Sequence, residues 1–313
     1  MKVLVAGATG AIGKPLIHAL LAAGHETVGL TSSDSGRAAL NQAGAEGVVA
    51  NALDSQAVDA AVRQVKPDAV IDELTSLPKH YTQEEMRVAA ERDRRIRLEG
   101  GRNLQNAAQA GGARRYIVQS TGFFYAPGEG LAAESEPLAE QASPNVAGSV
   151  RTYMQIEERV LGGGGLEGVA LRYGFFYGPG TWFHADGDIA AQVRLRQYPI
   201  TGAGQGVWSW VHIEDAAAIT VAALECAPGV YNIVDDDPAA LSLWLPSFAA
   251  AMGAPEPPRI SEQEALDAAG PDAIYYATRL RGASNAKAKR ELGFAPRRLE
   301  WLRQTETTGA GRP

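Results

Sequence analysis

The sequence has few cysteines and histidines, and their scarcity narrows the classes of protein that it can encode. Its 313 residues include one cysteine, Cys226, so no disulfide bond can form within the chain. The simplest interpretation is a reducing compartment, and we predict a cytoplasmic location. The five histidines are scattered without the spacing of metal ligands, so we predict no metal site.

The chain also lacks an excess of positive charge and any long apolar run. Its formal net charge of −7 at pH 7 argues against binding to nucleic acid. No apolar run reaches the roughly 18 residues that a transmembrane helix needs, so we predict no membrane partner. The first residues enter a strand pattern directly and lack the features of a signal peptide. With 45% hydrophobic residues, the chain can bury a sizeable core.

Apolar, strand-like runs alternate with helical patterns through the first two-thirds of the sequence. Residues 2–7 and 25–31 are typical of buried strands, and residues 11–24 between them show the spacing of an amphipathic helix. Repeated strand–helix–strand units predict an α/β fold: a doubly wound parallel sheet of the Rossmann type, with helices on both faces. Further strands are predicted at 47–51, 68–74, 114–121 and 168–176.

The alternation of strands and helices loosens after about residue 180. We predict a dinucleotide-binding Rossmann domain over residues 1–180, whose sheet is completed by parts of 207–235. A smaller, substrate-binding C-terminal lobe is predicted to consist mainly of residues 181–305. The last residues, 306–313, are predicted to form a flexible tail.

A glycine-rich turn follows the first predicted strand. Gly7 allows a tight turn, Gly10 lets the backbone approach a pyrophosphate, and Gly13 lets the helix pack closely on the sheet. The helix that follows offers free N–H groups and the positive end of its dipole to phosphates. The place of this turn between a strand and an amphipathic helix predicts a dinucleotide site. The predicted contacts in the turn are Gly7, Thr9, Gly10, Ala11, Ile12 and Gly13.

The end of the second predicted strand distinguishes the two nicotinamide cofactors. A carboxylate at this position would bind the ribose 2′-hydroxyl and repel a 2′-phosphate. The sequence instead offers neutral donors at Thr31, Ser32 and Ser33, and Arg37 lies within reach. Asp34 lies among them and weakens the inference. We therefore predict NADP as the cofactor and leave NAD open.

Several further motifs resemble the short-chain dehydrogenase/reductase superfamily. "GATGAIG" (7–13) looks like its glycine motif, "VIDELT" (70–75) its fourth-strand motif and "LRYGFFYGPG" (171–180) its sixth-strand motif. The resemblance covers nearly the whole chain and fits best the extended, NAD-dependent epimerase/dehydratase-like branch, in its atypical subgroups. The cofactor contacts that it further implies are Asn51, Ala52, Leu53, Leu74, Thr75, Tyr173, Gly174, Phe175 and Phe176.

The resemblance also implies a catalytic set: a serine or threonine, a tyrosine, and a lysine four residues after the tyrosine. Thr121 lies at the catalytic hydroxyl position of "STGFFY" (120–125), with Ser120 as the reserve candidate. Tyr153 is the best-placed tyrosine, at the start of a predicted helix. Glu157 stands where the lysine is expected, and Arg97 stands where the family often has an asparagine.

The missing lysine changes the chemistry that we expect of Tyr153. A unit charge about 6 Å away is worth roughly 3 kcal/mol at an effective dielectric of about 20, or about two pKa units. With an ionised Glu157 in its place, we expect the pKa of Tyr153 to rise and the phenol to stay protonated at neutral pH. Tyr153 could then still donate a proton to a developing alkoxide, but it would be a poor base for oxidising an alcohol. Glu157 itself is open to three interpretations: a ribose ligand, a general acid or base, or a solvated helix residue.

Aromatic residues gather in the part of the chain that is expected to close over a substrate. They favour an apolar or aromatic pocket, although aromatic side chains more often pack in a core. Residues 126–149 form a long polar loop of the kind that often acts as a lid. Asp72 and Glu73 alternate across a strand, so only one can face the cofactor. The predicted substrate contacts are Phe123, Trp182, Phe183, His184 and Trp210.

The sequence thus predicts an NADP-dependent oxidoreductase that reduces a carbonyl or polarised double bond of a small, largely apolar metabolite. Thr121 and Tyr153 would orient and protonate the oxygen. Three alternatives stay open. The first is an epimerase, dehydratase or isomerase with transient hydride transfer. The second is a non-redox acid–base catalyst that uses Tyr153 and Glu157. The third is a non-catalytic NADP sensor. A homodimer is a further open prediction.

Overall fold

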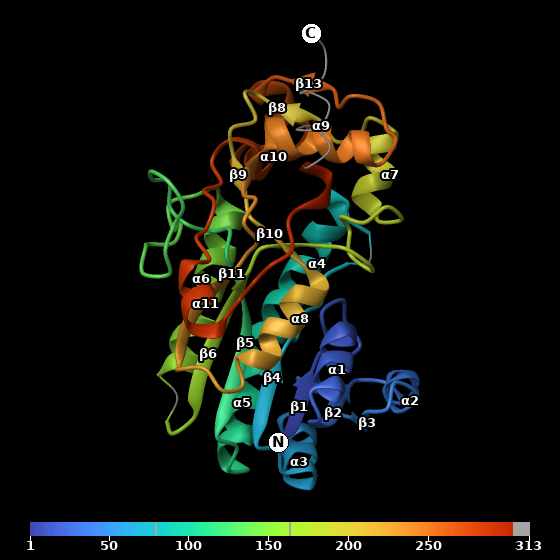
Figure 1. The fold of residues 1–313 in the computed structure, drawn as a ribbon, viewed down its shortest axis with the longest axis vertical. Coiled ribbons are helices and arrows are strands. Elements are labelled where there is room, and N and C mark those ends of the chain that lie inside the picture. Colours follow the sequence, from blue (N-terminus) through green and yellow to red (C-terminus); the bar gives the residue numbers. More distant parts are fainter. Residues whose placement is uncertain (79, 163, 303–313) are drawn as a thin grey trace.

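A seven-stranded parallel sheet forms the centre of the computed structural model, which describes residues 1–78, 80–162 and 164–302 (Figure 1). The strand order is β3-β2-β1-β4-β5-β6-β11, and every pairing in it is parallel. The order reverses between β1 and β4, as in a doubly wound Rossmann sheet, so the predicted fold class is confirmed. The strands are β1 Lys2–Ala6, β2 Glu26–Thr31, β3 Glu46–Val49, β4 Ala69–Asp72, β5 Arg115–Thr121, β6 Glu167–Tyr173 and β11 Gly229–Ile233.

Helices cover both faces of the sheet, which explains why its strands are apolar on both sides. α1 and α8 pack together on one face, where side chains such as Leu16 and Leu20 are fully buried. α3, α5 and α6 cover the other face. The helices are α1 Gly13–Ala22, α2 Asp34–Gln42, α3 Ser55–Val65, α5 Gly101–Ala110, α6 Pro144–Leu161, α8 Ile213–Ala222 and α11 Ala286–Leu292.

Residues 83–110 form one helical run of three segments. α4 (Gln83–Arg95) leads into η1 (Ile96–Gly100), a short π-helix, and α5 follows without a break. π-helical insertions are rare and often lie at functional sites. Among the described residues, no helix combines the length and apolar character required to cross a membrane.

A smaller lobe lies beyond the carboxyl ends of the sheet strands (Figure 1). Its core is aromatic, and Trp208, Trp210 and Trp244 are almost completely buried there. Three two-stranded ladders and three helices build it. These elements are β7 Phe175–Tyr177 with β10 Trp210–His212, β9 Val207–Trp208 with β12 Ala239–Ala240, β8 Ile200–Thr201 with β13 Arg259–Ile260, α7 Asp188–Arg194, α9 Leu241–Ala251 and α10 Glu262–Thr278.

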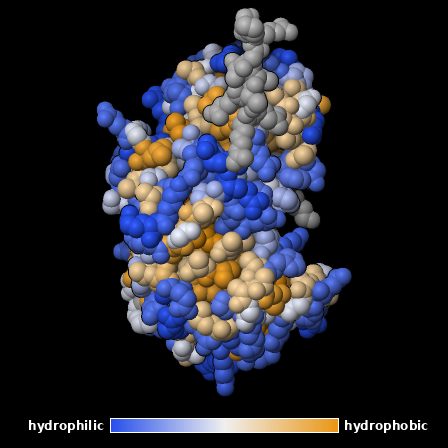
Figure 2. Space-filling view, viewed as in Figure 1, coloured by the Kyte–Doolittle hydropathy of each residue, from blue (hydrophilic) through white to orange (hydrophobic). Residues whose placement is uncertain are grey.

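The chain returns from the lobe to the sheet. α8 packs on α1, and β11 pairs with β6 as the seventh strand. On the face seen in Figure 2, hydrophobic residues gather where Figure 1 draws α8 and α1, with more hydrophilic residues above them. The domain boundaries near 180 and 305 remain predictions, and the tail at 306–313 lies outside the described residues.

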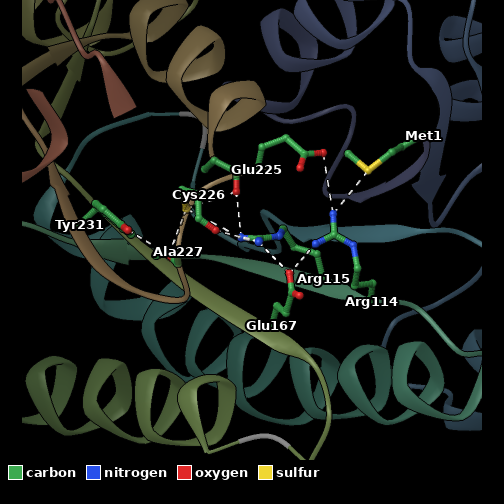
Figure 3. Close-up of polar contacts among 9 residues, drawn as sticks. Met1, Arg114, Arg115, Glu167, Glu225, Cys226, Ala227 and Tyr231 are labelled. Carbon is green, nitrogen blue, oxygen red and sulfur yellow. Dashed lines mark hydrogen bonds and ion pairs between the residues drawn. The ribbon is translucent and has the colours of Figure 1, made fainter. Parts of the chain in front are cut away.

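A buried arginine binds this returning segment to the first residues of β5 and β6 (Figure 3). Arg115, the first residue of β5, donates to the backbone oxygens of Ala223 at 3.1 Å and Cys226 at 2.7 Å, in the turn between α8 and β11. Its guanidinium also pairs with Glu167 at the start of β6, and Arg114 binds the same carboxylate from outside. Three segments that are distant in sequence are thereby joined.

Candidate active site

The glycine turn after β1 has the geometry that the sequence predicts. Gly7 has a positive φ of 77°, and a Cβ on it would overlap the backbone oxygen of Glu73. A Cβ on Gly13 would overlap the backbone of Gly7 and Ala8. Gly10 differs, because it is exposed and a Cβ there would meet only the Gly7 oxygen, at 3.1 Å. The open side of the turn therefore lies at Gly10.

The start of α1 offers unpaired donors on this open side. Ile12 is the N-cap residue, and no side chain caps the helix. Within the described part of the chain, the N–H groups of Ala11 and Ile12 have no acceptor. Thr9 and Ala11 are exposed beside Gly10. Free N–H groups at a helix start bind phosphates, so this turn fits the pyrophosphate of a dinucleotide.

The segment after β2 carries a carboxylate that is already paired. Asp34 binds Arg37 at 2.8 Å, and both side chains are exposed. Ser33 caps α2 by accepting the N–H of Gly36, while Ser32 is exposed. Thr31 is buried with its hydroxyl against Gly36. The residues directly after β2 are therefore neutral, and the nearby charges of Asp34 and Arg37 offset each other.

The loops after β3 and β4 hold the other predicted cofactor contacts. Asn51 is exposed and accepts the N–H of Leu53 at 3.1 Å, and the Ala52 oxygen accepts from Asn103 at 2.9 Å. These bonds fix the loop after β3. Leu74 is half-buried and Thr75 is exposed, just beyond the end of β4.

Ser120 and Thr121 are the last two residues of β5, and their hydroxyls have different surroundings. The Ser120 hydroxyl donates to Glu157 at 2.5 Å, on the face that α6 covers. The Thr121 hydroxyl is buried and has no partner within the described residues. A buried hydroxyl without a partner is unfavourable, and a bound ligand would supply one. Thr121, at the carboxyl end of β5, thus fits the role predicted for it better than Ser120 does.

Glu157 belongs to a buried ion pair and is not a solvated helix residue. Arg172 donates to one of its oxygens at 2.8 Å and to the other at 2.7 Å, and both side chains are at most 8% exposed. Arg172 also donates to Tyr125, which in turn donates to Asn232. Both oxygens of Glu157 are therefore occupied. This network favours a structural role, and the predicted catalytic role of Glu157 stays a prediction.

Tyr153 lies one helical turn before Glu157 and has different surroundings. It is half-buried, and the guanidinium of Arg97 lies 5.2 Å from the centre of its ring. Burial raises the pKa of Tyr153, Arg97 opposes the rise and Asp93 adds to it. The pKa shift has the expected direction, but its causes are burial and Asp93, whereas sequence reasoning assigned it to Glu157. Tyr153 is protonated at neutral pH.

Asp72 and Glu73 end β4 on opposite sides of the sheet. Asp72 accepts from the Tyr116 hydroxyl at 2.8 Å, and Glu73 accepts from the Tyr173 hydroxyl at 3.1 Å. Burial raises the pKa of Glu73 to about 8. Tyr173 is buried, and its hydroxyl also bonds Thr220 at 2.6 Å. The Tyr173 hydroxyl therefore already has partners within the protein, although Tyr173 was predicted to contact the cofactor.

The sixth-strand motif continues into a stack of rings. Phe175 is half-buried and lies between Phe123 and Trp208, with 4.0 Å between ring centres on each side. Gly174 is needed just before it, because a Cβ there would lie 2.6 Å from the Ser209 oxygen. Phe176 packs on the opposite core, beside Tyr173. Phe175 is thus the ring of this pair that lies near the lobe.

The predicted substrate residues divide into two groups. Phe123 and Trp182 are half-buried beside the end of β5 and the start of α7. Phe183 and Trp210 are buried in the lobe core, which favours the packing alternative for both. His184 pairs with Asp186 and is partly exposed.

Two tyrosines that sequence reasoning does not single out lie in this region: Tyr276, which is near Tyr153, and Tyr81, which is near Tyr276. Burial raises the pKa of Tyr276 in α10, and the phenols of Tyr81 and Tyr153 raise it further. Tyr81 precedes α4, and its ring lies 4.8 Å from that of Trp182. These residues come from distant segments with no shared motif, so no local pattern marks them.

The loop predicted as a lid is fastened to the lobe. Residues 144–149 belong to α6, and the remainder is held by Arg281, which pairs with Glu136 and donates to the Gly130 oxygen. Ser143 and Asn145 both bond Asp272 in α10. A cavity of about 630 Å³ lies between this loop and α10.

Residues 3–233 of the chain match the model of the NAD dependent epimerase/dehydratase family. The chain belongs to this family. The predicted resemblance is confirmed, and a nicotinamide dinucleotide is supported as the cofactor, whereas its contacts at the glycine turn stay a prediction. The protein is an NAD(P)-dependent enzyme of the short-chain type.

Relatives of the chain cover almost its full length. A 3-diazoavenalumate denitrifying reductase from a Streptomyces species is 38% identical over 304 residues, 96% of this chain and 98% of that protein. The UDP-glucose 4-epimerase of Thermus thermophilus, solved in complex with NAD, is 25% identical, with a TM-score of 0.71 over 99% of this chain and 100% of that chain. The Thermotoga maritima UDP-glucose 4-epimerase, solved with UDP-glucose, has a TM-score of 0.74 at 21% identity over 96% of each chain, a likeness of fold.

Proposed function

We propose that this enzyme is an NADPH-dependent reductase that adds hydride to a carbonyl or polarised double bond of a small, largely apolar molecule. The observation that carries the proposal is the buried, unpartnered hydroxyl of Thr121 at the carboxyl end of β5. Such a group is placed to donate to an oxygen that gains negative charge. NADPH, when bound, supplies the hydride.

Tyr153 has the protonation state that a reduction needs. Because burial raises the pKa of Tyr153, the phenol holds its proton at neutral pH. It can then protonate the substrate oxygen after a carbon–hydrogen bond forms and the carbon–oxygen π bond breaks. An epimerase that oxidises and then reduces its substrate also needs a base, and a phenol of raised pKa is almost entirely protonated at neutral pH, so little of it can accept a proton. The 38% identical relative is itself named as a reductase, which supports the same direction.

The segment after β2 supports NADPH over NADH. A free carboxylate at this position would repel the 2′-phosphate, but Thr31, Ser32 and Ser33 are neutral. The carboxylate of Asp34 is paired with Arg37, which reduces its repulsion. Arg37 is exposed and can turn to a 2′-phosphate.

A test compares NADPH oxidation by the wild type, Thr121→Val and Ser120→Ala with a panel of ketones and enones. We expect Thr121→Val to lower kcat about a hundredfold, the loss typical of one oxyanion donor, while NADPH affinity is unchanged. Ser120→Ala is the matched control, because its hydroxyl faces Glu157, and kcat should stay within a few-fold of wild type. Absence of NADPH affinity, or full activity in Thr121→Val, would overturn the proposal.

A further inference from the structure

Arg97 is bonded differently from the other buried arginines. Among the described residues, Arg97, Arg115, Arg172 and Arg281 are buried. In the last three, both terminal nitrogens donate to protein acceptors. In Arg97 the Nε donates to Asp93 at 2.7 Å, but the two terminal nitrogens have no acceptor in the described part of the chain. Neither nitrogen is among the fully enclosed unpaired atoms of the described residues, so both keep some surface that a ligand can reach.

The two terminal nitrogens of Arg97 lie close to the candidate active site. It lies in η1, the π-helical turn between α4 and α5, and its guanidinium stands over the ring of Tyr153. Burial raises the pKa of Asp72 and Glu73, and the charge of Arg97 opposes the rise in both. Arg97 therefore lies between the end of β4 and Tyr153 of α6, on the side of the sheet where the reaction is proposed to occur.

An aromatic cluster lies on the same side. All its rings are half-buried, so each keeps some surface open to a ligand. Burial raises the pKa of its three phenols, which shows that their hydroxyls lie in confined surroundings. Ring contacts join four members to one another, directly or through Phe124, and the other two form a pair. All six pack against the core of the lobe. The aromatic cluster consists of Tyr81, Phe123, Tyr153, Phe175, Trp182 and Tyr276.

We infer that the substrate is a planar aromatic molecule with one carboxylate, which Arg97 binds through its two terminal nitrogens while the aromatic cluster packs against the ring. This inference rests on the proposed function, which places the reacting atoms near Thr121 and Tyr153. A guanidinium with two parallel free donors matches the geometry of a carboxylate. Flat apolar rings match an aromatic substrate.

The same residues argue against a sugar nucleotide. A nucleoside diphosphate sugar carries two phosphate charges and a polar sugar, whereas the aromatic cluster is mainly apolar. Of the four buried arginines, three are already committed to Glu167, Glu157 and Glu136. Arg97 alone remains, and its charge is shared with Asp93, so the site provides for one further negative charge.

Equilibrium binding to the NADP-saturated enzyme tests this inference without requiring turnover. The probes are 4-hydroxycinnamate, its neutral amide and UDP-glucose, each titrated by calorimetry. We expect the carboxylate to bind about 10- to 100-fold more tightly than the amide, as charge-assisted hydrogen bonds predict. UDP-glucose should bind more weakly than the carboxylate. Equal affinity for acid and amide, or tighter binding of UDP-glucose, would overturn the inference.

Variants of Arg97 test whether this residue causes the preference for the acid over the amide. Arg97→Met should lower the affinity for the acid to that for the amide, and Arg97→Lys should lower it several-fold. Arg95→Met is the matched control, because Arg95 lies in the same helical run and is exposed and paired with Glu99. It should retain the preference. If Arg97→Met does not fold, Arg97→Lys decides: an unchanged preference refutes the role of Arg97. Loss of NADPH binding by the wild type would refute the proposed reductase, whereas an absent acid preference refutes only the substrate class.

Discussion

At the scale of single residues, the ion pair between Glu157 and Arg172 favours a structural role for Glu157 over a catalytic one. Both oxygens of Glu157 bind Arg172, and Ser120 adds a third bond. Restoring the lysine of the superfamily through Glu157→Lys would place two cations together in a buried site. We expect a loss of at least about 3 to 5 kcal/mol in the free energy of unfolding and no gain in activity. Urea unfolding measures the first and NADPH oxidation the second.

Glu158→Lys is the control for this prediction, because Glu158 is the next residue and is exposed. It should change the free energy of unfolding by less than about 0.5 kcal/mol. A stable and more active Glu157→Lys enzyme would show instead that position 157 is the catalytic position.

Glu73 is also expected to make the stability of the fold depend on pH. Burial raises its pKa from 4.5 to about 8 in the folded state. Between pH 4.5 and 8 the unfolded chain loses this proton while the folded chain keeps it, so rising pH destabilises the fold. We expect the stability of wild type relative to Glu73→Gln to fall by up to about 1.4 kcal/mol per pH unit across this window. Urea unfolding at a series of pH values measures it.

Glu84→Gln is the comparison for Glu73. The pKa of exposed Glu84 is lowered by Arg87, so no fall of this kind is expected between pH 4.5 and 8. A constant difference between wild type and Glu73→Gln would mean that Glu73 keeps an ordinary pKa in the fold.

At the scale of elements, the glycine turn and the sheet could be predicted because their signals are local. Gly7, Gly10 and Gly13 adjoin the strand and helix that they connect. The partner of Glu157 could not be predicted, because it depends on how α6 lies across β6. Arg97 binds Asp93, four residues earlier, but its position over the Tyr153 ring depends likewise on how η1 lies against α6. Sequence also does not show which aromatic rings face the core, as Trp210 and Phe183 do.

Arg115 supports a prediction about how the elements are held together. Arg115→Met removes donors from two backbone oxygens in the turn between α8 and β11, and from Glu167 at the start of β6. The Cys226 oxygen would lose this donor inside the protein, and the Ala223 oxygen would keep only the weak thiol donor of Cys226. We therefore expect the free energy of unfolding to fall by about 2 to 4 kcal/mol. Urea unfolding provides the measurement.

Arg114→Met is the matched control for Arg115, since Arg114 binds the same Glu167 but its side chain is 45% exposed. An exposed pair of this kind contributes at most about 1 kcal/mol. Equal losses in the two variants would show that the backbone bonds of Arg115 add no stability.

At the scale of the whole molecule, cofactor choice should appear as a difference in stabilisation. A ligand at about 100 times its Kd stabilises the fold by about 2.7 kcal/mol, which raises Tm by several degrees. We expect NADPH to raise Tm more than NADH at equal concentration, because the segment after β2 is neutral and Arg37 is near. Differential scanning fluorimetry measures both.

Arg37→Met should reduce the Tm increase with NADPH to that with NADH. Arg63→Met is the control, because Arg63 is also exposed and paired with a carboxylate of its own helix, Asp59. A larger Tm increase with NADH in the wild type would assign the enzyme to NAD.

The seventh strand of the central sheet, β11, comes late in the sequence, which limits where the chain can be cut into fragments or recombined with a relative. A fragment ending near residue 180 would leave one edge of β6 unpaired and, without α8, would uncover apolar side chains beside α1. Exposed edges and apolar faces promote aggregation. A functional chimera with a relative should therefore exchange the lobe as two segments, one between β7 and α8 and one from β12 to α10, and keep residues 213–233 from the parent that supplies the first strands.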